Sequence, residues 1–182
     1  MNNIINLGEP KFLLHQMAKA SGVEPGTIRV WFQRGHISLG LTDKEAEGNG
    51  FARLFSARTV LLIAIMGALT KLGVEPRRAG EAAFEFCYGD GDITTTGGFG
   101  DDDDFKLDRL GGYLCAAKET ILVVTSSTVN FSYVLPINNS SDFYNFIENI
   151  HDVSKYGATF IPLHDLVNNT RLKLGLPQDI SS

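Results

Sequence analysis

The chain has 182 residues, of which 43% are hydrophobic and 20% are charged, and its formal net charge is -5. This is the composition of an ordinary globular protein with one sizeable domain or two small ones. The longest apolar stretch, residues 60–69, is too short to cross a bilayer, which takes roughly 20 apolar residues. The first residues also lack the pattern of an export signal, so a cytoplasmic protein without a membrane partner is expected.

The charge is distributed unevenly along the chain. Residues 1–89 carry ten basic and eight acidic side chains, whereas residues 90–182 carry six basic and thirteen acidic ones. This asymmetry restricts contact with a polyanion to the first half. The two cysteines, Cys87 and Cys115, belong to no CxxC or CxxH pattern, so neither a disulfide framework nor a metal site is expected, and buried free thiols are predicted.

Two short helices with a tight turn between them are predicted near the N-terminus. Apolar residues at helical spacing predict the first helix over residues 12–20, and Gly22 lies in the turn that ends it. Pro25 stands at a first-turn position of the second helix, where its missing N–H costs nothing, and Gly35 ends that helix.

The second helix is predicted to be amphipathic. Its apolar side consists of Ile28, Trp31 and Phe32, and these residues are expected to pack against the rest of the domain. The opposite side is expected to be exposed and basic, and it consists of Arg29, Val30, Gln33 and Arg34.

A hairpin and two further helices are predicted next. Apolar alternation after residue 37 and the pair Asn49-Gly50 indicate a β-hairpin within residues 37–55. Ser56 is a suitable N-cap for a long helix that ends near Gly73, and another helix is predicted over residues 75–88. Because residues 60–69 are apolar over a wide surface, they are a candidate dimer contact, as is the last predicted helix of the chain.

Residues 89–111 are rich in glycine and aspartate and are predicted to be a linker between two domains. The aspartates at 101–104 suggest a metal site, and Asp90, Asp92, Thr94 and Asp101 faintly resemble a calcium loop. Glycine at position six and glutamate at position twelve of such a loop are missing, so a solvated linker is the better interpretation. Beyond the linker, β-branched and aromatic runs predict an antiparallel meander over 113–117, 120–127 and 129–137. A helix over 141–153, a strand over 158–162 and a helix over 163–174 complete the chain.

Ala18, Gly22 and Ile28 stand at the spacing of a helix-turn-helix, which needs a small residue, a turn glycine and an aliphatic anchor at these positions. The whole stretch AKASGVEPGTIRVWFQRGHI resembles the opening of the winged helix-turn-helix of the MerR family. Gly50-Phe51, followed by Arg53, is similar to the end of that family's wing, with Ala52 as one additional residue. The resemblance extends over about residues 10–88.

The resemblance implies that the second helix enters the major groove and that the hairpin is a wing. Thr27, Arg29 and Arg34 would contact DNA from the helix, and Arg53 would contact the backbone from the wing. Val30 stands where the family usually has a groove-facing tyrosine, and Gln33 shares the exposed side. The family's metal-binding cysteines and long dimerising helix are not seen after residue 88, so metal sensing is not implied.

The sequence therefore predicts an α+β protein with a DNA-binding domain (1–88), a linker (89–111) and a small α+β effector or oligomerisation domain with an antiparallel sheet (112–182). Its expected function is that of a sequence-specific, nucleoid-associated transcriptional regulator that binds double-stranded DNA as a homodimer. No cofactor is expected, and an unknown small molecule or protein is expected to act as its effector. An architectural or excisionase-type recombination factor and a protein-interaction module that no longer binds DNA are the alternatives.

An enzyme is not expected. The pairs His151-Asp152 and His164-Asp165 resemble parts of hydrolase metal sites, but no further metal ligand accompanies them at suitable spacing. A phosphate-binding glycine loop and a nucleophile elbow are also missing from the sequence.

Overall fold

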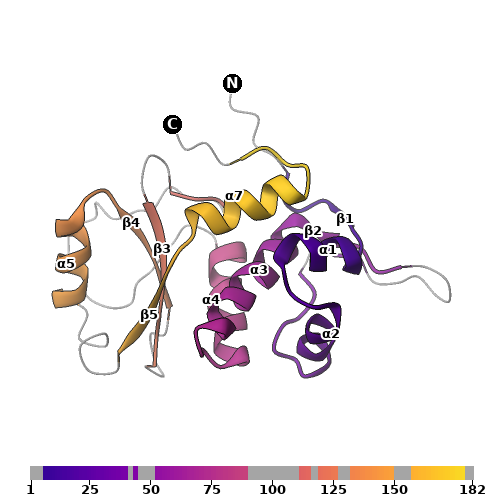
Figure 1. Cartoon of the computed structure of the whole chain (residues 1–182), viewed down its shortest axis with the longest axis horizontal. Coiled ribbons are helices and arrows are strands. Elements are labelled where there is room, and N and C mark those ends of the chain that lie inside the picture. The colour runs from indigo at the N-terminus through magenta and orange to yellow at the C-terminus, as the bar shows by residue number, and fades with distance from the viewer. Residues whose placement is uncertain are drawn as a thin grey trace.

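Helices dominate the first part of the chain and a small sheet the second, in the computed structural model (Figure 1). The structure describes residues 6–40, 43–44, 52–89, 111–115, 119–126, 132–149 and 157–178. The predicted α+β class is confirmed. In Figure 1 the first two helices lie at one end, the sheet lies toward the other end, and two further helices lie between them.

The first two helices form a helix-turn-helix, as predicted. Helix α1 (Leu14–Ser21) ends at Gly22, whose φ of 70° is left-handed and whose N–H donates to the Ala18 carbonyl at 2.9 Å. Helix α2 (Pro25–Gln33) begins with its proline and is followed by Gly35, also left-handed with φ 67°. The sequence predicted α1 to start at residue 12, but residues Pro10–Phe12 form strand β1, which pairs antiparallel with β2 (Phe55–Ser56).

Helix α3 (Ala57–Lys71) is the centre of the hydrophobic core. The Ser56 hydroxyl caps it by accepting from the Thr59 N–H at 3.4 Å, as predicted. Every residue from Thr59 to Gly67 is buried, because α1, α4 (Pro76–Tyr88) and α7 (His164–Lys173) pack around this helix. The prediction that residues 60–69 form a dimer surface is therefore wrong: their apolar surface is wide because it is covered within the chain.

Helix α4 packs against the segment after α2 at Gly80, which has no side chain. A Cβ atom on Gly80 would collide with the backbone carbonyl oxygen of His36. We expect Gly80→Ala to lower the free energy of unfolding by about 1–3 kcal/mol, because the collision forces a backbone shift that the gain in helix propensity offsets only in part. Urea denaturation measures the change. Gly26→Ala is the matched control, since a Cβ there meets no atom within 4 Å; equal stability of the two variants would contradict this account.

The second part of the chain contains a three-stranded antiparallel sheet in the order β4-β3-β5. Strand β3 (Glu119–Thr125) pairs with β4 (Ser132–Ile137) from Glu119↔Ile137 to Val124↔Ser132, and with β5 (Ala158–Pro162) from Ile121↔Pro162 to Thr125↔Ala158. The antiparallel pairing of β3 with β4 is that of the predicted meander, but the strand on the other side of β3 is β5, which the meander did not include.

The first strand predicted for this sheet is not formed in its described part, residues 113–115. There the Cys115 N–H donates to the Thr120 hydroxyl at 2.8 Å instead of to a ladder partner. Both cysteines are buried thiols outside any disulfide, as predicted. Helix α5 (Ser140–Asn149) confirms the start of the predicted helix after β4, and residues 150–156 lie outside the described part of the chain.

The two predicted domains share a hydrophobic core. One face of the sheet, including Leu122, Val124 and Ile161, belongs to the same cluster as α3 and α4. The other face carries Val123 and Tyr133 and packs against Phe146 of α5. Neighbouring strand residues such as Val123 and Val124 lie on opposite faces because side chains alternate along a strand with a period of two.

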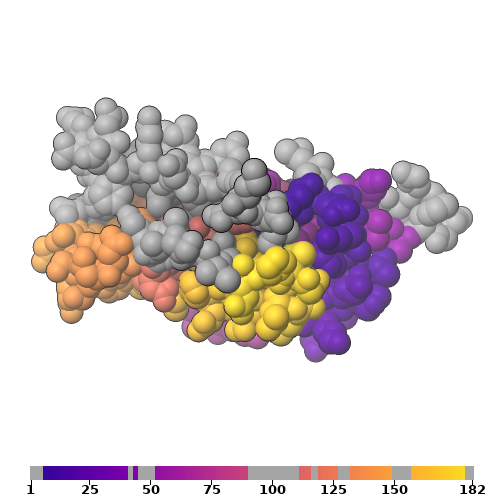
Figure 2. Space-filling model, turned by 90° about the horizontal axis from the view of Figure 1, so that it is seen from above, coloured from indigo at the N-terminus to yellow at the C-terminus, as the bar shows by residue number. Residues whose placement is uncertain are grey.

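Helix α7 packs the end of the chain onto its beginning, and Figure 2 shows it beside the N-terminal elements. Lys173 donates to the Ala20 carbonyl of α1 at 3.4 Å. The buried Arg171 donates to the Gly112 carbonyl at 3.1 Å, and its guanidinium lies 4.7 Å from the centre of the Tyr113 ring. Gly112 in turn donates to the Phe86 carbonyl of α4 at 2.9 Å. The two ends of the predicted linker therefore lie side by side, while residues 90–110 are outside the described part.

Candidate nucleic-acid interface

The residues predicted to contact DNA lie on the exposed side of α2. Thr27, Arg29, Val30, Gln33 and Arg34 are all exposed. On the opposite side Ile28 is fully buried and Trp31 is 5% exposed, which confirms the prediction that the tryptophan packs inside rather than serving as a surface for base stacking. Because this apolar side is held in the core, the helix presents its polar side to solvent in a defined orientation.

The exposed residues occupy two edges of α2. With about 100° of rotation per residue, Arg29 and Gln33 lie on one edge and Thr27 and Arg34 on the other. The first edge borders a hollow beside the predicted wing, and Arg34 borders a second hollow shared with α4. The structure thus brings Arg53 together with Arg29 and Gln33, and it places Arg34 on the far side of the helix.

The hollow beside the wing has a volume of about 610 Å³. Its described lining includes two arginines and a histidine and no acidic side chain, and basic groups gathered on one face attract anions. The lining comes from α1, α2 and residues 52–55, and consists of Leu13, Leu14, His15, Pro25, Arg29, Phe32, Gln33, Ala52, Arg53 and Phe55. His15 belongs to this site although nothing in its sequence context indicated it.

Arg53 lies against α2. Its guanidinium carbon is 5.8 Å from the centre of the Phe32 ring, within the range of a cation–π contact. The Phe32 ring itself lies 5.7 Å from that of Phe55, a buried residue of β2. These contacts join the base of the predicted wing to α2, so the wing arginine and the helix form one surface. The sequence predicted a core position for Phe32 and not its contact with Arg53.

Asp43 lies at the base of the predicted wing and accepts three hydrogen bonds there. Its carboxylate accepts from the Gly40 N–H at 2.9 Å, from the Ser56 N–H at 2.7 Å and from the Thr59 hydroxyl at 2.7 Å. Next to it, Lys44 and Leu54 exchange two backbone hydrogen bonds of 3.0 and 3.1 Å, an antiparallel pair of the kind that the predicted hairpin requires. The hairpin loop, residues 45–51, lies outside the described residues.

Tyr88 completes this network. Its hydroxyl lies 2.7 Å from that of Thr59, and burial raises the pKa of Tyr88 above its ordinary value of 10.0. Between the two pKa values the unfolded chain has lost the Tyr88 proton and the folded chain has kept it. The contribution of this proton to stability is therefore complete below pH 10 and decreases as the pH rises further.

We expect Tyr88→Phe to lower the free energy of unfolding at about pH 8 by about 0.5–1.5 kcal/mol, because the hydrogen bond to Thr59 is lost. As the pH is raised above 10, the parent is expected to lose more stability than the variant, so that the two curves converge. Urea denaturation in this pH range measures both. Parallel curves would show that Tyr88 has no perturbed titration.

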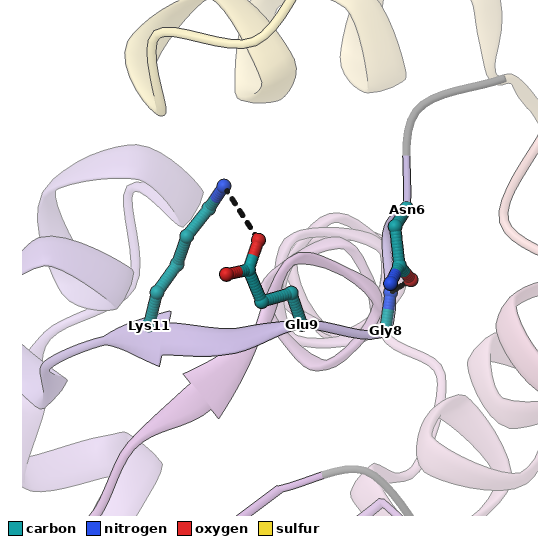
Figure 3. A network of polar contacts seen from close by, with 4 residues as sticks. All are labelled: Asn6, Gly8, Glu9 and Lys11. Carbon is teal, nitrogen blue, oxygen red and sulfur yellow. Dashed lines mark hydrogen bonds and ion pairs between the residues drawn. The ribbon is translucent and has the colours of Figure 1, made fainter.

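Basic side chains around the interface differ in whether they are neutralised. Lys11 forms an exposed ion pair with Glu9 at 3.5 Å (Figure 3). In the same segment the Gly8 N–H donates to the Asn6 side chain. Arg77 is similarly paired with Glu81 on α4 at 3.0 Å. Among the described residues, Arg29 and Arg34 have no carboxylate partner, so their charges remain available to an external anion.

The part of the chain that the structure describes contains no group of three or more histidine, cysteine, aspartate or glutamate side chains able to hold a metal ion. None of its helices combines the length and apolar character needed to cross a membrane.

The site is thus the exposed basic side of α2 beside the base of the predicted wing, in a helix-turn-helix packed on a common core. Comparison with known protein families gives no match, and comparison with curated proteins gives none either.

Proposed function

We propose that the chain is a sequence-specific transcriptional regulator that binds double-stranded DNA, with α2 in the major groove and the wing beside the DNA backbone. The observation that carries this proposal is the hollow that brings Arg29 and Gln33 of α2 together with Arg53. Arginine and glutamine supply the donors and acceptors that read base edges, and guanidinium groups also bind phosphate.

The packing of α2 supports the same proposal. A helix that reads bases must keep a fixed orientation, and Ile28 and Trp31 anchor α2 to the core through side chains that contribute nothing to the exposed side. Arg53 lies next to that helix through its contact with Phe32, so helix and wing approach the duplex as one body.

The test is selection of duplexes from a random pool by the full chain, followed by affinity measurements over a salt series. We expect an enriched motif, and a logarithm of affinity that falls linearly with the logarithm of salt concentration, because each neutralised phosphate releases counterions. An enriched motif that maps to attachment sites would favour a recombination factor. No enriched motif and no salt-dependent binding would favour a protein-interaction module.

The regulator is further proposed to act in the cytoplasm as a homodimer, since one helix-turn-helix contacts few base pairs and two half-sites increase specificity. With α3 covered inside the chain, α7 is the remaining predicted contact, and its Leu172 is 60% exposed. Sedimentation of the parent and of Leu172→Asp gives the oligomeric state. The part of the chain after residue 112 is proposed to receive the small-molecule or protein effector.

A further inference from the structure

Val30 is an exposed aliphatic side chain on the polar side of α2. It is 38% exposed, whereas Ile28 and Trp31 of the same helix are buried. Its position does not serve the packing of the helix, since the core contacts of α2 lie on the opposite side. An isolated exposed valine is ordinary on a protein surface, so its meaning depends on where it lies relative to the DNA-contact residues.

Val30 occupies the middle of the proposed DNA-binding side. On a wheel of about 100° per residue it falls between the edge with Arg29 and Gln33 and the edge with Thr27 and Arg34. The two hollows that border α2 confirm this division, because Arg29 and Gln33 line one and Arg34 lines the other. When a helix enters the major groove, the middle of its exposed side lies nearest the base edges, and longer side chains on its two edges reach either bases or the flanking phosphates.

Gly26 lies one turn before Val30 on the same side of the helix. A Cβ atom at Gly26 would meet nothing within 4 Å, and its φ is not in the left-handed region, so neither space nor backbone conformation requires glycine there. Glycine inside a helix lowers its stability relative to alanine. A glycine at this position also lets the helix backbone approach a ligand closely, because it has no Cβ atom.

We infer that Val30 reads the 5-methyl group of a thymine in the major groove, and that Gly26 lets the helix come close enough for the contact. This inference rests on the proposed function. Valine has no side-chain donor or acceptor, and among the base edges of the major groove the thymine methyl group is the apolar feature. Cytosine at the same place would offer no methyl group and would leave its amino group against the valine without a hydrogen-bond partner.

The test uses the full chain and the duplex obtained by selection, with each thymine replaced in turn by deoxyuridine, which lacks only the methyl group. One thymine in each half-site is expected to show about a fourfold loss of affinity on replacement, the value for burial of one methyl group. In Val30→Ala the same replacement is expected to have no effect. Val30→Thr, which keeps one methyl group at the branch point, is expected to retain part of the discrimination.

The outcomes separate this inference from the proposed function. If a motif is selected but no thymine shows a Val30-dependent effect, thymine reading is wrong and DNA binding stands. If no motif is selected, both are wrong. Gly26→Ala is expected to weaken binding of the selected duplex at least fivefold without lowering the melting temperature, since the added methyl group keeps the backbone from the bases. Unchanged binding of that variant would overturn the role given to Gly26.

Discussion

Arg29→Ala is expected to reduce discrimination between the selected duplex and an unrelated duplex about ten- to hundredfold, the range for one arginine that reads a guanine in a bidentate manner. Arg29 is exposed on the edge of α2 that borders the hollow, and among the described residues it has no carboxylate partner to hold it away from DNA. Its removal should therefore relax sequence preference at one base-pair position while leaving binding to unrelated DNA nearly as strong.

Fluorescence anisotropy with both duplexes at the same salt concentration measures this ratio. Lys71→Ala is the matched control, since it also removes one exposed positive charge but lies at the end of α3, outside both hollows that border α2. The control should keep its discrimination. If Arg29→Ala discriminates as well as the parent, or if the control loses as much, the assignment of α2 as the recognition helix is wrong.

Asp43→Ala is expected to lower the free energy of unfolding by about 2–4 kcal/mol, because three donors lose one charged acceptor and the Ser56 N–H is left without a partner at a buried position. Asp43 is half-buried, so water can reach part of the site and the loss stays within this range. Asp43→Asn should lie between the parent and the alanine variant, since its amide keeps one acceptor oxygen but turns a donor toward another donor.

Urea denaturation measures these differences, with Glu9→Ala as the control. Glu9 is an exposed acid whose ion pair with Lys11 is on the surface, so its removal should change stability by less than about 1 kcal/mol. Because Asp43 also holds the base of the predicted wing next to Arg53, Asp43→Ala should weaken the proposed DNA binding more than Glu9→Ala does at a temperature where both are folded. Equal stability of Asp43→Ala and Glu9→Ala would contradict the role of this network.

The sequence predicted those parts of the fold that depend on neighbours along the chain. The turn at Gly22, the start of α2 at Pro25 and the cap of α3 at Ser56 are each made by groups within about four residues. The exposed and buried sides of α2 likewise follow from helical periodicity alone. For this reason Thr27, Arg29, Val30, Gln33 and Arg34 could all be placed on one surface before any packing was known.

The tertiary structure decided what depends on residues far apart in the chain. Strand β5 pairs with β3 rather than β4, α3 is covered on every side, and Arg53 lies over Phe32 instead of extending away from the helix. Asp43 bonds to residues from Gly40 to Thr59, and no local pattern marks it as an acceptor. Periodicity and caps arise from short-range hydrogen bonds and rotation per residue, whereas strand partners and the neighbours of a side chain depend on how the whole chain packs.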